Sequence, residues 1–265
     1  MDTAQGPDYA LLDRLGADAQ IFYPRDDWNP PPPGARDELV SVTSGVRVAC
    51  RFHPLDPARP SLLFFHGNGE VASDYDGLIA LYRQARINLW VADYRGYGAS
   101  EGRPSFAALV ADAHPVLDRF HAALDEWGFG GQRFVMGRSL GTHPALELAA
   151  RRAERLQGLV IESGAANLAR LVRRLAPSAP VAETDALIAR HKAKVESIRL
   201  PTLIIHGADD ELVPVQTALE LYDALSTERK ELVIIPNAGH NDLLWLGAEQ
   251  YMTALGHFVA NEAAA

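Results

Sequence analysis

The sequence has a single cysteine, Cys50, and no excess of basic residues. One cysteine cannot form a disulfide within the chain, and no second thiol is available for a thiolate metal site or a redox pair. The chain has 25 Lys and Arg against 34 Asp and Glu, a formal net charge of −9, so it lacks the basic face that binds a nucleic-acid backbone. We therefore expect a cytoplasmic protein that does not bind nucleic acid.

Long hydrophobic runs are also missing. The N-terminal stretch MDTAQGPDYALLDRLG has neither a basic start nor an unbroken apolar segment, so it does not resemble a secretory signal. The apolar runs elsewhere are too short to span a bilayer and are bounded by turn residues, which is typical of buried parallel strands. We expect no integral membrane segment.

The length of 265 residues and the hydrophobic content of 48% are sufficient for one large α/β domain. A proline run, NPPPPG at residues 29–34, is too stiff for a helix interior or a central strand. We interpret residues 1–37 as an N-terminal extension that contains this loop, and residues 38–265 as the domain.

Short apolar segments alternate with helical ones in the domain, which predicts a mostly parallel sheet flanked by helices. Residues 38–42 and 46–52 flank Thr43-Ser44-Gly45 and predict an antiparallel hairpin at one edge of the sheet. The predicted parallel strands are Leu62–Phe65, Leu89–Ala92, Phe134–Met136, Leu159–Ile161, Leu203–Ile205 and Leu232–Ile235.

Four segments with residues suited to catalysis directly follow four of these strands. Ligands bind at this end of the strands in open parallel sheets. The most informative is Gly137-Arg138-Ser139-Leu140-Gly141, a G-x-S-x-G pattern between a strand and a helical stretch. That context predicts a tight turn that exposes the Ser139 hydroxyl as a nucleophile. The glycines are required because the turn leaves no room for side chains.

The turn Phe65-His66-Gly67-Asn68-Gly69 follows the first parallel strand. A reaction through a tetrahedral oxyanion needs fixed backbone N–H donors, and glycine lets the backbone approach the reacting carbonyl. We assign these donors to the N–H groups of Asn68 and Leu140. His66 is expected to brace the turn rather than to act on substrate.

A serine nucleophile needs a histidine base, and the histidine needs a carboxylate partner. His240 lies on a glycine-containing loop after the last strand and is the expected base, whereas His143 is discounted because an elbow serine points away from its own helix. Asp209 and Asp210 both follow the strand Leu203–Ile205, so spacing alone leaves both open. Glu162, at the end of another strand, is a third possible acid.

Four motifs together resemble the serine hydrolases of the α/β-hydrolase superfamily, from about residue 38 to the C-terminus. They are HGNG at 66–69, DYRGYGAS at 93–100, GRSLG at 137–141 and HGADDELVP at 206–214. Within that superfamily they look like the small α/β-hydrolase-domain group that includes protein depalmitoylases. The resemblance implies an α/β-hydrolase fold with a small helical cap.

In that group the acid normally stands four residues after the histidine of H-G-x-x-D, which implies Asp210 here and makes Asp209 the alternative. The resemblance also implies a structural role for Glu162. The chain departs from the group at two points. Pro144 disfavours a regular helix soon after Ser139. The N-terminal cysteine cluster of the membrane-acting depalmitoylases is missing, so depalmitoylation at a membrane is not implied.

The expected activity is hydrolysis of a small carboxylic ester or thioester through a Ser139 acyl-enzyme with a Ser-His-Asp triad, without a cofactor or a metal ion. A peptidase, an amidase or a carbon–carbon bond hydrolase could use the same triad. A ligand-binding protein that has kept the scaffold is the alternative outside enzymology. The sequence indicates neither the natural substrate nor the oligomeric state.

A cap is expected at about residues 163–200, between two predicted strands. This segment has seven basic and three acidic residues, whereas the whole chain is acidic. Leu168, Leu171 and Val172 share a helical face, and Arg170 and Arg173 lie away from its centre. These arginines either form a solvated surface or attract an anionic part of the substrate.

Overall fold

A computed structural model describes residues 6–16, 18–175 and 180–264 and contains an eight-stranded sheet. Its strands are β1 (Arg36–Thr43), β2 (Val46–His53), β3 (Ser61–Phe65), β4 (Asn88–Ala92), β5 (Arg133–Arg138), β6 (Gly158–Glu162), β7 (Thr202–Gly207) and β8 (Lys230–Ile235). Every predicted strand is therefore confirmed, with ends that differ by no more than a few residues.

The strands are ordered β1-β2-β4-β3-β5-β6-β7-β8 across the sheet. Strand β2 pairs antiparallel with both β1 and β4, and the pairs from β4 to β8 are all parallel. The predicted hairpin thus forms the β1 edge. Parallel neighbours place their carboxyl ends at the same edge of the sheet, which brings the turns after β3, β5, β7 and β8 together.

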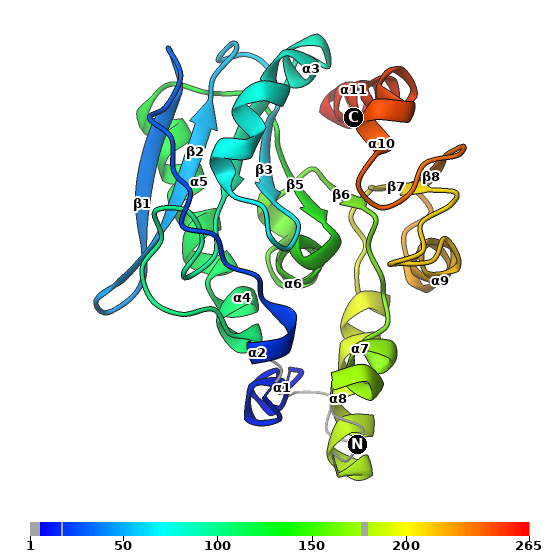
Figure 1. The fold of residues 1–265 in the computed structure, drawn as a ribbon. Coiled ribbons are helices and arrows are strands. Elements are labelled where there is room, and N and C mark those ends of the chain that lie inside the picture. Colours follow the sequence, from blue (N-terminus) through cyan, green and yellow to red (C-terminus); the bar gives the residue numbers. More distant parts are fainter. Residues whose placement is uncertain (1–5, 17, 176–179, 265) are drawn as a thin grey trace.

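Helices cover both faces of the sheet (Figure 1). The α-helices are α1 (Ala10–Arg14), α2 (Asp18–Ile21), α3 (Ile79–Gln84), α4 (Phe106–Ala111), α5 (Ala113–Glu126), α6 (Thr142–Arg151), α7 (Ala169–Leu175), α8 (Val181–Glu196), α9 (Gln216–Ala224), α10 (Leu243–Leu246) and α11 (Ala248–Ala264). Short 3₁₀ helices are η1 (Ala72–Leu78), η2 (Ser139–Gly141) and η3 (Ala153–Arg155).

The interiors of the central strands are apolar because both of their faces are buried. In β3, Leu63 and Phe65 join the hydrophobic core beneath α5 and α6, whereas Leu62 and Phe64 join the core beneath α3 and α11. This alternation is the two-residue period of a strand. Two cores therefore hold the sheet rigid from both sides and fix the turns at its edge.

The segment between β6 and β7 contains the helices α7 and α8, which extend from the main body (Figure 1). The sequence between these helices contains Pro177 and Pro180, and residues 176–179 lie outside the described ranges. The division into an N-terminal extension, a domain and a cap stays a prediction about how the chain is organised.

Candidate active site

The turn after β5 holds Ser139 in a strained conformation. Its φ is 51°, in the left-handed region that side-chain-bearing residues rarely adopt. A Cβ on Gly137 would overlap the carbonyl of Gly141, and one on Gly141 would overlap the carbonyl of Phe65. The expected requirement for glycine on both sides is thereby explained. The irregularity expected soon after Ser139 is limited to the 3₁₀ turn η2, because Pro144 itself lies in the first turn of the α-helix α6.

His240 lies between Ser139 and Asp210. Its Nε2 is 2.9 Å from Ser139 Oγ, and its Nδ1 is 2.7 Å from Asp210 Oδ2. Both distances are within hydrogen-bond reach for proton transfer and for fixing the imidazole tautomer. The structure thus joins three residues that are far apart in the sequence, in the arrangement that activates a serine hydroxyl.

Asp210 is 4% exposed and is held in place by the loop that carries it. Its Oδ1 accepts the Val213 N–H at 2.7 Å. Burial alone would raise the pKa of Asp210, but the hydrogen bonds from His240 and Val213 outweigh it and lower this pKa below its usual value. The carboxylate is therefore charged near neutral pH. The side chain of Asp209, by contrast, is exposed to solvent.

The loops after β7 and β8 are in close contact. The backbone N–H groups of Ala208 and Asp209 donate to the carbonyls of Ile235 at 3.0 Å and Ala238 at 2.8 Å. A Cβ on Gly207 would overlap the carbonyl of Ala238. The glycine thus permits the approach that brings Asp210 to His240.

The two predicted oxyanion donors lie on neighbouring turns. Strand β3 pairs with β5, and Phe65 at the end of β3 is the partner of Gly137. Among the described residues, no turn or loop hydrogen bond involves the backbone N–H of Asn68, and Leu140 lies in η2 directly after Ser139. Backbone N–H groups on turns next to a nucleophile are the kind of donor that an oxyanion hole needs.

The N-terminal segment fixes the Asn68 turn, which the sequence did not indicate. The Asn68 side chain donates to the Ile21 carbonyl and accepts hydrogen bonds from Tyr23 N–H at 3.0 Å and Tyr97 Oη at 2.7 Å. Arg25 donates to the Gly69 carbonyl at 3.0 Å. The extension therefore holds the loop of one proposed oxyanion donor.

His66 braces the same turn from inside the protein, as expected. Its Nε2 lies 2.9 Å from Asp93 Oδ1, and its Nδ1 lies 2.8 Å from the Gly67 carbonyl. Burial alone would lower the pKa of His66, but the hydrogen bond to Asp93 and the charge of this carboxylate raise it. Asp93 also accepts the Ala72 N–H at 2.7 Å.

Arg138, directly before Ser139, holds the histidine loop in place. Its Nη2 donates to the His240 carbonyl at 2.9 Å and to Asn241 Oδ1 at 2.8 Å, and its Nε donates to Glu162 Oε1 at 2.9 Å. Its Nη1 is paired with Glu70. Burial would lower the pKa of Arg138, but the two carboxylates raise it. Sequence reasoning missed this role, because no pattern links position 138 to residues 70 and 240.

Glu162 and His143, the alternative acid and base, are not part of the hydrogen-bonded series Ser139–His240–Asp210. Glu162 bonds to Arg138 and accepts the Tyr251 hydroxyl at 2.7 Å, which agrees with the structural role implied for it. His143 packs against the rings of Phe106 and His191. Burial and the nearby charge of Lys194 lower the pKa of His143 to about 3, which makes it a poor base near neutral pH.

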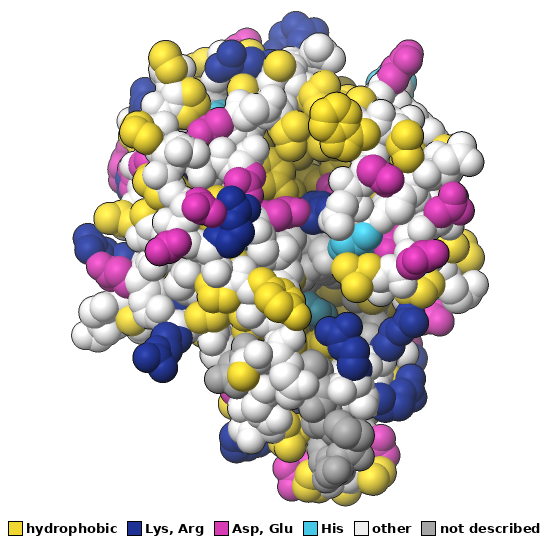
Figure 2. Space-filling model, in the orientation of Figure 1, with side chains coloured by type: hydrophobic (Ala, Val, Ile, Leu, Met, Phe, Trp, Pro, Cys, Tyr) yellow, Lys and Arg dark blue, Asp and Glu magenta, His cyan; other side chains and the backbone are white. Residues whose placement is uncertain are grey.

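Arg170 and Arg173 are exposed on α7 and are not brought to the catalytic residues. No ion pair joins either of them to another described residue. Figure 2 shows Lys and Arg side chains on the face where Figure 1 places α7. Their expected role in binding an anionic substrate therefore stays a hypothesis.

Within residues 6–16, 18–175 and 180–264, no group of three or more His, Cys, Asp or Glu side chains could hold a metal ion. None of the helices described in these ranges is long and apolar enough to cross a membrane.

Comparison with known families gives one family model, described as "Serine aminopeptidase, S33", that matches residues 56–190 and 171–244. The chain is 32% identical over 235 residues to the human alpha/beta hydrolase domain-containing protein 17B, covering 84% of this chain and 75% of that protein. It is 33% identical over 226 residues to the aho-3 protein of Caenorhabditis elegans, covering 83% of this chain but only 63% of that protein.

Solved structures show the same fold. The Pyrococcus furiosus esterase Pf2001 superposes with a TM-score of 0.70 at 18% identity, covering 90% of this chain and 98% of that one. Est1E from Butyrivibrio proteoclasticus, solved with ferulic acid bound, gives a TM-score of 0.69 at 18% identity, with 86% and 100% covered. At this level of identity the likeness extends to the fold alone.

Proposed function

This chain belongs to the α/β-hydrolase superfamily, in its alpha/beta hydrolase domain-containing group, and we propose that it is a serine hydrolase acting on a carboxylic ester or thioester. The observation that carries the proposal is the hydrogen-bonded chain from Ser139 Oγ through His240 to Asp210. The strained turn at Ser139 and the neighbouring turn that carries Asn68 support the same interpretation.

In the proposed acylation step, His240 Nε2 takes the proton of Ser139 Oγ as the oxygen attacks the substrate carbonyl. Asp210 keeps the Nδ1 proton in place and stabilises the imidazolium that forms. The N–H groups of Asn68 and Leu140 donate to the oxyanion, a contribution typically worth about 3 kcal/mol for one donor. His240 then passes its proton to the departing alcohol or thiol, and an acyl-enzyme remains on Ser139.

In the proposed deacylation step, water replaces the leaving group. His240 removes a proton from this water, which attacks the acyl carbonyl through a second oxyanion in the same hole. Collapse of that intermediate returns the proton to Ser139 Oγ and releases the carboxylic acid. The cycle needs no metal ion or cofactor.

A peptidase or amidase activity is the second candidate, because the matching family model is described as a serine aminopeptidase. The same residues would serve, with an amine as the leaving group. Parallel assays of an ester, a thioester and an amide of the same acyl group rank these alternatives. Hydrolysis that persists in a folded Ser139→Ala variant would refute the proposal, as would wild-type protein that hydrolyses none of the three.

A further inference from the structure

The side chain of His66 is completely buried, and both of its ring nitrogens face oxygen atoms. Nδ1 lies 2.8 Å from the carbonyl oxygen of Gly67, and Nε2 lies 2.9 Å from Asp93 Oδ1. A carbonyl oxygen can only accept a hydrogen bond, so Nδ1 must carry a proton to form this contact. The state of Nε2 then decides whether the ring is neutral or charged.

The contacts of Asp93 favour a proton on Nε2 as well. Asp93 Oδ1 also accepts the Ala72 N–H at 2.7 Å, and an ionised carboxylate can only accept hydrogen bonds. An unprotonated Nε2 would place its lone pair against those of this oxygen at a distance of 2.9 Å. With a proton on both nitrogens, the His66 ring is a positively charged imidazolium.

The other groups around His66 are also suited to a positive charge. Burial alone would lower the pKa of His66, but the hydrogen bond and charge of Asp93, together with the charge of Glu70, raise it above its usual value. Tyr94 and Tyr97 have ring centroids 4.5 and 5.8 Å from that of His66, within the range in which an aromatic ring can stabilise a cation. A buried charge needs a partner of opposite sign, and the buried Asp93 supplies it.

The carbonyl that His66 contacts belongs to the same peptide group as the Asn68 N–H, one of the two proposed oxyanion donors. In a trans peptide the carbonyl and the N–H point in opposite directions. The Gly67 carbonyl accepts hydrogen bonds from His66 Nδ1 at 2.8 Å and from the Glu70 N–H at 3.4 Å. Because these bonds hold the carbonyl towards the buried ring, they direct the Asn68 N–H away from it.

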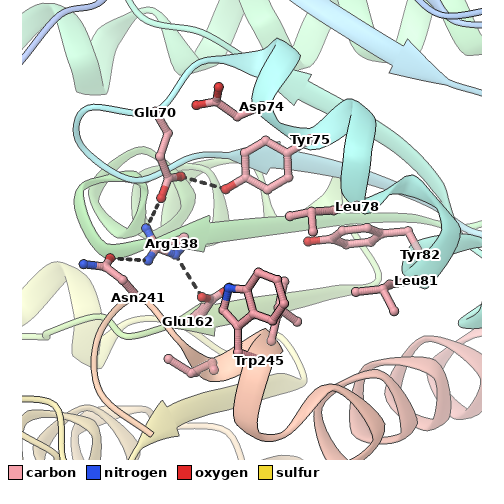
Figure 3. A pocket seen from close by; sticks show the side chains of 12 residues that line it. Glu70, Asp74, Tyr75, Leu78, Leu81, Tyr82, Arg138, Glu162, Asn241 and Trp245 are labelled. Atoms are coloured by element: carbon pink, nitrogen blue, oxygen red, sulfur yellow. Dashed lines mark hydrogen bonds and ion pairs between the residues drawn. The ribbon is translucent and has the colours of Figure 1, made fainter.

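Glu70 holds Gly67 from its other side. Its Oε2 accepts the Gly67 N–H at 2.7 Å and the Tyr75 hydroxyl at 2.7 Å. Its Oε1 is paired with Arg138 (Figure 3), the residue directly before Ser139. The turn that carries the donor peptide is therefore fixed at both of the backbone polar groups of Gly67 and is connected to the strand that carries the nucleophile.

We propose that His66 is a positioning residue that acts as an imidazolium, and that its Nδ1–H orients and polarises the peptide group supplying the Asn68 N–H. A hydrogen bond from a charged donor draws electron density towards the carbonyl oxygen, and the N–H of the same peptide becomes a stronger donor. The negative oxyanion gains more from this donor than the neutral ester carbonyl does, so the effect is on the rate of the chemical step. The inference rests on the proposed hydrolase function.

NMR spectra of the full chain labelled with ¹⁵N-histidine test the charge without any need for turnover. At pH 7 both ring nitrogens of His66 should carry a proton, with the signals assigned by their loss in His66→Gln and by the shift of the Nε2 signal in Asp93→Asn. His53 is the reference, because burial and the charges of Arg51 and Arg83 lower its pKa to about 4. It should show one unprotonated nitrogen. An unprotonated nitrogen in His66 would overturn the proposal.

Kinetics with p-nitrophenyl acetate test the positioning role. His66→Gln removes the charge and should lower kcat and kcat/KM equally, by roughly tenfold, which is less than the roughly 10²- to 10³-fold cost of losing a whole oxyanion donor. Asp93→Asn keeps an acceptor opposite Nε2 but removes its charge, and should lower both constants by a smaller factor. His53→Gln is the matched control. His53 is also buried beside a carboxylate, Asp76, at 3.3 Å, and this variant should keep the wild-type kcat.

Urea unfolding separates this role from a structural one. Loss of a buried histidine should lower the stability of both His66→Gln and His53→Gln, whereas only His66→Gln should lose kcat. If folded His66→Gln kept the wild-type kcat while hydrolysis that depends on Ser139 persisted, the proposal would be overturned and the proposed function would survive.

The backbone amide proton of Asn68 gives a second readout that does not depend on turnover. Its resonance should move upfield in His66→Gln, because the peptide is less polarised, and should stay in place in His53→Gln. This result, with two protons on the His66 ring, would support the proposal even if the wild-type protein hydrolysed no ester, an outcome that would refute only the hydrolase. An unchanged Asn68 resonance in His66→Gln would contradict the proposal.

Discussion

Two regions of this molecule join a hydroxyl group to a buried histidine. In the serine cluster, Ser139 Oγ lies 2.9 Å from His240 Nε2, and the other imidazole nitrogen is 2.7 Å from Asp210. Each ring nitrogen therefore has a partner of the kind that proton transfer needs: a hydroxyl on one side and a carboxylate on the other.

The tyrosine cluster lies where the N-terminal segment meets α6 and α8. The Tyr9 hydroxyl is 2.8 Å from His191 Nδ1 and accepts a hydrogen bond from Lys194 at 2.6 Å. Lys194 also pairs with Glu147 at 2.9 Å. Within the described residues, His191 has no carboxylate partner. Burial raises the pKa of Tyr9 and lowers that of His191.

The difference indicates which features would make a hydroxyl–histidine pair a catalytic site. His191 is a weakened base beside a hydroxyl that resists ionisation, so this pair joins elements of the fold. His240 contacts a charged carboxylate, Asp210, at Nδ1, and a strained turn places the Ser139 hydroxyl at its Nε2. Backbone strain and the partner on the second nitrogen, rather than the hydroxyl–imidazole contact, distinguish the two regions.

Replacing each histidine by alanine gives the largest expected contrast. His240→Ala should lower kcat roughly 10⁶-fold, the scale typical of removing a triad histidine. His191→Ala should keep kcat and lower the free energy of unfolding by about 1–3 kcal/mol through the lost hydrogen bond. Ester hydrolysis and urea unfolding measure the two effects. Comparable losses of kcat in both variants would show that the two histidines do not differ in their importance for catalysis.

The two adjacent aspartates refine the comparison within the serine cluster. Asp210→Asn should lower kcat about 10⁴-fold, because His240 loses the partner that fixes its tautomer. Asp209→Asn is the matched control and should leave kcat close to wild type, since the Asp209 side chain is exposed. If Asp209→Asn gave the larger loss, the acid would have to be reassigned.

In the tyrosine cluster, Lys194→Met should reduce the free energy of unfolding by about 3 kcal/mol, because it leaves the largely buried Glu147 carboxylate without its ammonium partner. Lys192→Met is the control. Lys192 is exposed and paired with Glu196 one turn away, so its loss should cost less than about 0.5 kcal/mol. Urea unfolding at pH 7 measures both. Equal losses would show that burial of the Lys194 pair contributes nothing.

The same pair makes stability sensitive to acid. Burial alone would raise the pKa of Glu147, but the hydrogen bond from His114 and the charge of Lys194 lower it from 4.5 to about 2. A depressed carboxyl pKa stabilises the folded state above pH 4.5, and this contribution is lost as the pH falls from 4.5 towards 2. Lys194→Met should therefore show a shallower fall in stability over that window. If the slope of the unfolding free energy against pH were unchanged, Glu147 would not be a cause of the acid sensitivity.

The smallest expected effect concerns the arginines of α7. If they attract an anionic substrate group, Arg170→Glu/Arg173→Glu should raise KM for an acidic ester roughly two- to fivefold more than for a neutral ester of equal length. Added salt should weaken the preference of the wild type. Identical KM changes for the two esters would leave these side chains as a solvated surface.

The features that could be predicted are those that depend on short stretches of the sequence. The strands and the turn at Ser139 follow from apolar runs and from glycines flanking one serine, and the partner of His240 could be placed within one loop. Two features could not be predicted. Arg138 joins Glu70 to the His240 loop, and Ile21 and Tyr23 hold the Asn68 turn. Both features depend on contacts between residues far apart in the sequence, and the spacing of residues along the chain does not predict such contacts.

We propose that Ser139 is the nucleophile and that His240 and Asp210 activate it. Treatment with a fluorophosphonate, followed by mass spectrometry of the modified peptides, tests this claim without knowledge of the natural substrate. We expect one adduct per chain on Ser139, none in folded Ser139→Ala, and much slower labelling in His240→Ala. An adduct on a different residue, or no adduct on the folded wild-type protein, would contradict it.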